Sequence, residues 1–326
     1  MLLRMSVRAL FSEGPLLGPD FPLPLDRPFR SADALRAGVT RAVLARLLRE
    51  GYLRRLLKSV YVAAQVTDSI VLRAQALRLV VPAPAVVTDW TAVWLYTGLL
   101  PPGDHLRVPP VSLFLPAGRG RLRNGLCVSG ERTFIASDLD RVGGLWVTTP
   151  LRTAWDVGRL FRRDTAIGGL DGLLRKRYFT HDLLVGGIER FRRQRGVVQL
   201  RGLAPLADGR AESPAESVLR LRWLDVSSLP KPKPQVPILD DRGIEIYRLD
   251  LGVAELRFAA EYDGEEFHTS DEDREHDEGR RQWIRENRGW IVEVLRRHNV
   301  FGPRRDVEAI LTEGIHRARR RLRTRP

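Results

Sequence analysis

The chain has 326 residues, of which 54 are lysine or arginine and 40 are aspartate or glutamate, giving a formal charge of +14. With 43% hydrophobic residues it is not an intrinsically disordered chain, and its length predicts two or three domains. The single cysteine, Cys127, excludes a disulfide framework and a cysteine-based zinc site. The positive charge predicts a polyanionic partner, typically nucleic acid, or else reflects an arginine-rich composition inherited from a GC-rich genome.

Residues 1–30 are rich in Pro and Gly, which predicts an irregular leader. Arg4 and Arg8 interrupt the apolar run that an export signal needs. No apolar run reaches the ~18 residues that span a bilayer. We therefore expect a cytoplasmic protein with no membrane contact.

The next segment, 31–65, predicts a winged helix-turn-helix. A short helix starts at Ser31, and a second helix is capped by Thr40 and ends at Gly51. Strands are predicted around Tyr52–Leu56 and Ser59–Val62. The second helix would enter the major groove of DNA. The alternative is a solvated surface on a small domain that packs against its neighbour. The cations expected to contact DNA are Arg41, Arg46, Arg49, Arg54, Arg55 and Lys58.

The hairpin sequence Lys58-Ser59-Val60-Tyr61 resembles the G-V-Y strand that ends the helix-turn-helix of type IV abortive-infection antitoxins, with Ser59 where glycine is common. Residues 66–207 are similar to the larger, nonenzymatic domain of that family. This similarity rests on the T-x-P-x-R-T-x-x-D pattern of Thr148–Asp156. The resemblance implies an antitoxin-like middle region with strands and helices. The same pattern also predicts a helix start, with Thr149 as cap and Pro150 in the first turn.

Residues 208–326 predict an α/β/α domain with a mixed central sheet and a basic C-terminal tail. A helix opens at Ser213-Pro214, and a charged helix follows the first three strands. The predicted strands are Gln235–Leu239, Glu245–Leu251, Leu256–Tyr262 and the returning strand Trp290–Leu295. The charged helix is predicted over Asp271–Asn287.

Three acids lie where this sheet would bring them together. Asp250 interrupts an apolar strand, Glu261 ends the next strand eleven residues later, and Glu216 lies on the preceding helix. Carboxylates bind Mg²⁺ or another divalent cation through oxygen, which predicts metal-assisted hydrolysis of phosphodiesters. Glu216 has a second interpretation, because Ser213-x-x-Glu216 is also a capping box. The acids between Glu261 and Glu278, ten against one arginine, form either a solvated helix face or a cation site.

The segments Arg248–Leu251, Arg257–His268 and Gly289–Val294 resemble the very-short-patch-repair-like branch of the PD-(D/E)XK nuclease superfamily. The resemblance implies a restriction-endonuclease-like fold over about 212–300, with Asp250 and Glu261 as metal ligands and Glu216 as an auxiliary acid. The usual lysine two residues after the acid is Asp263 here. The branch uses a downstream histidine, which assigns His268 as general acid/base. Arg280 and Arg281 are candidates for the missing cation.

Two functions follow from these observations, beside a third interpretation as a structural or partner-binding protein that does not bind nucleic acid even at low salt. The first is a DNA-binding protein with a Mg²⁺-dependent endonuclease-like domain. The second is a nonenzymatic transcriptional regulator or type IV antitoxin-like protein with a degenerate nuclease fold, acting with a toxin or operon partner. The departure at Asp263 favours the second. Oligomeric state has no signature in the sequence.

Overall fold

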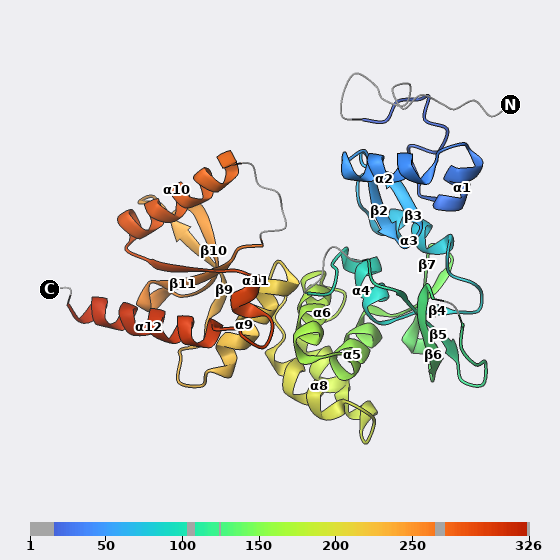
Figure 1. Cartoon of the computed structure of the whole chain (residues 1–326). Coiled ribbons are helices and arrows are strands. Elements are labelled where there is room, and N and C mark those ends of the chain that lie inside the picture. The colour runs from blue at the N-terminus through green and yellow to red at the C-terminus, as the bar shows by residue number, and fades with distance from the viewer. Residues whose placement is uncertain (1–15, 103–107, 124, 265–270, 325–326) are drawn as a thin grey trace. The chain divides into compact units, whose positions relative to one another are not determined.

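The computed structural model describes residues 16–102, 108–123, 125–264 and 271–324, with side chains from 278 onward in the last range (Figure 1). The protein is a mixed α/β protein with three sheets in this part of the chain. It divides into two compact units, Met1–Leu100 with Leu106–Ala154 and Pro101–His105 with Trp155–Pro326. Across the described ranges, no helix is long and apolar enough to cross a membrane.

The first unit begins with the elements predicted for 31–65. The hydroxyl of Thr40 accepts a hydrogen bond from the Val43 amide and caps the second helix, as predicted. Gly51 follows that helix with φ +78°, and Ser59 turns the hairpin with φ +65°, a conformation that glycine adopts more readily. Each hairpin strand begins one residue later than predicted. The elements are β1 (Phe29–Arg30), α1 (Ser31–Arg36), α2 (Arg41–Arg49), β2 (Leu53–Leu57) and β3 (Val60–Ala63), in the antiparallel sheet order β1-β3-β2.

Part of the predicted leader belongs to the core of this unit. Leu17 and Phe21 are only 3% and 4% exposed and join Phe29, Leu44 and Leu47 in one hydrophobic cluster. Their segment has little regular secondary structure, and burial rather than backbone pairing fixes its place.

The rest of the first unit is built on a five-stranded sheet of order β6-β5-β4-β8-β7. The T-x-P-x-R-T-x-x-D residues begin a helix, α5 (Pro150–Leu160), and the Thr149 hydroxyl accepts the Arg152 amide as the predicted cap. Arg152 pairs with buried Asp138, so in this structure the motif stabilises the fold. The other elements are α3 (Ile70–Arg78), β4 (Val86–Val87), α4 (Asp89–Thr97), β5 (Val111–Pro116), β6 (Cys127–Arg132), β7 (Leu139–Val142) and β8 (Leu145–Thr148).

The second unit combines a helical part with a four-stranded sheet. After α5 come α6 (Arg163–Arg175), α7 (His181–Gly186) and α8 (Val197–Leu203), and α6 packs against α9 (Pro214–Asp225). The sheet has the order β12-β11-β10-β9, antiparallel except for the parallel β11/β12 pair. Its strands are β9 (Lys233–Leu239), β10 (Glu245–Val253), β11 (Phe258–Tyr262) and β12 (Ile291–Leu295).

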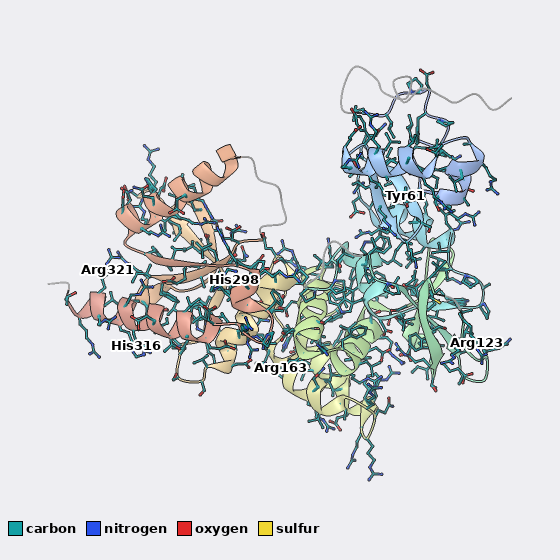
Figure 2. The ribbon with its side chains drawn as sticks, in the orientation of Figure 1. Tyr61, Arg123, Arg163, His298, His316 and Arg321 are labelled. Carbon is teal, nitrogen blue, oxygen red and sulfur yellow. The ribbon has the colours of Figure 1, made fainter. Side chains whose placement is uncertain are left out.

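Helices cover both faces of this sheet (Figure 1). Helix α9 and the C-terminal α12 (Val307–Arg323) pack on one face, and Ile284 of α10 (Asp271–Arg288) packs on the other, with the short α11 (Arg297–Val300) after β12. The predicted mixed sheet between helices is therefore present. The third strand starts at Phe258 rather than Leu256, because Ala254–Leu256 form a 3₁₀ turn. Figure 2 shows the side chains of α12, where His316 and Arg321 are both exposed.

Helix α12 approaches β11 so closely at Gly314 that a side chain does not fit. A Cβ there would lie 2.4 Å from Cε2 of Phe258, a fully buried ring. We expect Gly314→Ala to lower the free energy of unfolding by about 1–2 kcal/mol, since overpacking outweighs the gain in helix propensity. The matched control is Gly279→Ala on α10, where a Cβ meets nothing within 4 Å among the described residues; it should stabilise by about 0.5–1 kcal/mol. Urea unfolding of both variants checks this, and equal effects would contradict it.

Candidate functional site

The predicted acids Asp250 and Glu261 lie on neighbouring antiparallel strands. Leu251 of β10 pairs with Ala260 of β11, and the same register continued by one residue puts Asp250 opposite Glu261. Directly opposite residues of an antiparallel pair project on the same side of the sheet. Oδ2 of Asp250 accepts a hydrogen bond of 2.8 Å from the Tyr262 amide, which ties Asp250 to the strand that carries Glu261. The eleven-residue spacing thus brings the two carboxylates together.

The environment of Asp250 disfavours its negative charge. Burial raises the pKa of Asp250, and the nearby charges of Glu216 and Glu261 raise it further, to about 8. The Tyr262 hydrogen bond and the charge of Arg280 oppose this shift. The charge of Glu216, on α9, therefore acts on Asp250. We call Asp250, Glu261 and Glu216 the acid cluster.

Glu261 is buried and paired with two arginines of α10. Nη2 of Arg280 lies 3.1 Å from Oε1 and 3.2 Å from Oε2, and Nε of Arg281 lies 3.1 Å from Oε2. The side chain of Glu261 is only 5% exposed, so both ion pairs are largely shielded from water. The two arginines bring positive charge to a site where the usual PD-(D/E)XK motif has a lysine.

Glu216 shows features of both interpretations left open by the sequence. The Ser213 hydroxyl accepts a 3.1 Å hydrogen bond from the Glu216 amide, as in a helix cap. However, Oε2 of Glu216 accepts the amide of Glu212 (2.9 Å) and the side-chain amide of Gln235 (3.0 Å). Burial raises the pKa of Glu216. The cap hydrogen bond is present, and the charge of Glu216 acts on Asp250.

Of the two other predicted site residues, only Asp263 lies within the described residues. Asp263 is half-buried; its amide donates to the Leu295 carbonyl, and its carboxylate lies 3.8 Å from Nε of Arg296. His268 and the side chains of the acids 271–277 lie outside the described residues.

The predicted nucleic-acid-binding cations of the first unit are mostly on the surface. Arg41, Arg46, Arg49, Arg55 and Lys58 are exposed, and Arg46 pairs with Glu50. Lys58 also donates to the Gly125 carbonyl at 3.4 Å. Arg54 is different: its guanidinium turns inward to the Val66 carbonyl, which makes it a structural residue of the hairpin.

The donor chemistry of the acid cluster fits a hard divalent cation. Asp250 and Glu261 offer carboxylate oxygens, and Mg²⁺ is commonly held by one or two carboxylates plus water. A cation would also relieve the repulsion that raises the pKa of Asp250. Within the described ranges, no group of three or more His, Cys, Asp or Glu side chains is close enough to hold a metal ion. The fit therefore rests on the two strand carboxylates.

Sequence reasoning missed Gln235. It adopts φ +54° within β9, an unusual conformation for a residue with a side chain, and its amide reaches Glu216. The only local signal is a polar residue between Pro234 and Pro237 in a strand that is otherwise apolar after Lys233.

The shifted pKa of Asp250 has a measurable effect on stability. Burial and the neighbouring acids raise the pKa of Asp250 from its ordinary value of 3.8 to about 8 in the folded protein. Between these values the unfolded chain releases the proton and the folded chain retains it, so wild-type stability falls as pH rises toward 8. In buffer with EDTA, the free energy of unfolding of Asp250→Asn minus that of wild type should increase by at least about 1 kcal/mol from pH 5 to pH 8. Urea unfolding across this pH range checks it, and a pH-independent difference would contradict it.

Comparison with known proteins identifies relatives in one organism. No family model matches the chain. The uncharacterized proteins Rv2248 and MT2308, from two strains of Mycobacterium tuberculosis, are each 34% identical over 255 residues, which cover 78% of this chain and 89% of theirs. This chain belongs to the Rv2248 family. The match to the crystal structure of RV2827C from Mycobacterium tuberculosis covers 59% of this chain and 74% of the RV2827C chain, at 14% sequence identity. Its TM-score of 0.28 is too low to support an argument about the Rv2248 family.

Proposed function

We propose that the protein binds DNA and that its C-terminal segment hydrolyses phosphodiester bonds with a divalent cation such as Mg²⁺. The observation that carries this proposal is the pairing of Asp250 with Glu261 across two strands, beside Glu216. The resemblance of residues 212–300 to PD-(D/E)XK nucleases points to the same chemistry.

The carboxylates of Asp250 and Glu261 would hold the cation, which when bound activates water and neutralises charge on the phosphate. The Tyr262 amide fixes one oxygen of Asp250, so the ligand is held before substrate arrives. Glu216 is anchored by the amides of Glu212 and Gln235. In its ionised form the Glu216 carboxylate, whose pKa is raised by burial, would accept the proton that an attacking water loses.

Arg280 and Arg281 replace the missing lysine in this proposal. Their pairing with Glu261 holds both guanidinium groups at the acid cluster. Guanidinium groups bind phosphate oxygens through parallel hydrogen bonds and stabilise the negative charge that develops during phosphodiester cleavage.

The exposed cations of α2 and the β2–β3 hairpin provide the DNA-binding surface of the first unit. Arg41 and Arg49 project from α2, and Arg55 and Lys58 from the hairpin. Such side chains neutralise phosphates and release counterions, so binding should weaken steeply with salt.

A cleavage assay tests the proposal. Wild-type protein is incubated with supercoiled plasmid and with short duplexes, matched and mismatched, in Mg²⁺ or in EDTA. We expect nicked or cut product in Mg²⁺ and none in EDTA. No product with any substrate in Mg²⁺ would refute the nuclease activity.

The second candidate is a nonenzymatic regulator or antitoxin-like protein. It is favoured by the contacts of Glu261, whose two oxygens already pair with Arg280 and Arg281, and by Asp263 in place of lysine. This protein would bind a palindromic site upstream of its own operon, and Asp250→Ala would leave that binding unchanged. A mobility-shift assay with the upstream DNA distinguishes the two candidates.

A further inference from the structure

A basic cleft lies beside the acid cluster in the second unit. It has a volume of about 510 Å³ and is lined by four arginines, one glutamate and one glutamine. These side chains come from the end of α6, the segment before α9, and two strands. They are Arg175, Arg177, Arg210, Glu212, Gln235 and Arg248.

Three contacts connect the cleft to the acid cluster. Gln235 lines the cleft and donates to Glu216. The Glu212 amide donates to the same carboxylate. Arg248 precedes Asp250 by two residues on β10, and its carbonyl accepts a 3.5 Å hydrogen bond from Arg280. A ligand in the cleft would therefore lie next to the proposed catalytic acids.

The walls of the cleft are held by structural contacts. Arg175 donates to the carbonyls of Arg210 and Ala211 and pairs with Glu212 at 2.9 Å, which fastens the segment before α9 to α6. A Cβ on Gly209 would lie 2.8 Å from the Arg175 amide, so the two backbones are in close contact. Arg175 is thus a supporting residue of the cleft.

The other arginines can bind a ligand. Arg177 is exposed and has no ion pair among the described residues. Arg210 and Arg248 pair with Asp208 and Glu245, but their side chains are 59% and 49% exposed. Exposed ion pairs of this kind contribute only about 0–1 kcal/mol, so a phosphate can displace the acid.

We propose that this cleft binds the phosphate backbone of the DNA strand beside the acid cluster, an inference that rests on the proposed function. Planar guanidinium groups match the geometry of phosphate oxygens. The cleft gives the helical part of the second unit a role in holding the substrate through Arg177 and Arg210, which lie outside the segment that resembles nucleases.

The test measures how the affinity of the full chain for a short duplex depends on NaCl concentration, in Ca²⁺ buffer, for Arg177→Gln, Arg248→Gln and the double variant. Each lost phosphate contact should reduce the slope of log K against log salt by about 0.9. We expect each single variant to bind the duplex about 3–10-fold more weakly at low salt. In the double variant the two losses of affinity and the two reductions in slope should add. The matched control is Arg192→Gln, which removes an exposed charge of the same unit outside the cleft.

The outcomes separate this inference from the proposed function. Reduced slopes in the cleft variants and an unchanged slope in Arg192→Gln support the inference, whether or not the wild type cleaves DNA. Wild-type slopes in both cleft variants overturn the inference alone, even if Mg²⁺-dependent cleavage is observed. No DNA binding by the wild type overturns both.

Discussion

Asp250→Asn should reduce Mg²⁺-dependent cleavage by at least about 100-fold, because Asp250 is one of two proposed ligands of a cation that would supply several kcal/mol of transition-state charge stabilisation. The variant keeps an oxygen that can accept the Tyr262 amide, so the strand pairing that Asp250 supports is retained. Removing the shifted carboxyl should also stabilise the folded chain at neutral pH. Lost activity in a protein that is at least as stable as wild type cannot be explained by unfolding.

The matched control for this prediction is Glu255→Gln, which removes an exposed carboxylate from the 3₁₀ turn between β10 and β11. Its cleavage rate should equal that of wild type. Single-turnover rates at saturating protein, measured with the same labelled duplex, compare the three proteins. Undiminished cleavage in Asp250→Asn would show that the acid pair is not catalytic.

Local sequence pattern was sufficient to predict that Asp250 and Glu261 lie close together. The extended segments predicted from the sequence correspond to β10 and β11, and their antiparallel register brings Asp250 and Glu261 close together. The cap by Thr40 followed from the same kind of short-range rule. Such predictions succeed because the interacting groups are neighbours in sequence or in one hairpin.

The remaining features depend on packing between distant segments. Which arginines of α10 reach Glu261 depends on the rotation of that helix against the sheet, which Ile284 in the core sets. The burial of Leu17 and Phe21 depends on a hydrophobic cluster formed by residues that follow them. The positive φ of Gln235 is not predicted by the conformational propensity of glutamine. These features could not be read from periodicity.

Asp171→Ala should destabilise the second unit by about 3–5 kcal/mol, because it leaves a buried arginine without its counterion. Asp171 of α6 lies 2.8 Å from Nη2 of Arg220 on α9, and both side chains are at most 5% exposed. The carboxylate also accepts the Asp208 amide at 2.8 Å. Urea unfolding measures the loss. Asp182→Ala, which removes an exposed carboxylate from α7, should cost less than about 1 kcal/mol.

A second variant separates the charge from the volume of the side chain. Replacing both partners with apolar residues, Asp171→Leu with Arg220→Met, removes the uncompensated charge and should recover much of the lost stability. The double variant leaves the Leu206 carbonyl, to which Arg220 donates at 2.7 Å, without this hydrogen bond, so the recovery of stability should be incomplete. A double variant less stable than Asp171→Ala would contradict this account. Because α9 carries Glu216 in its first turn, this ion pair also holds the helix that positions Glu216 at the acid cluster. Loss of the pair should therefore lower activity as well as stability.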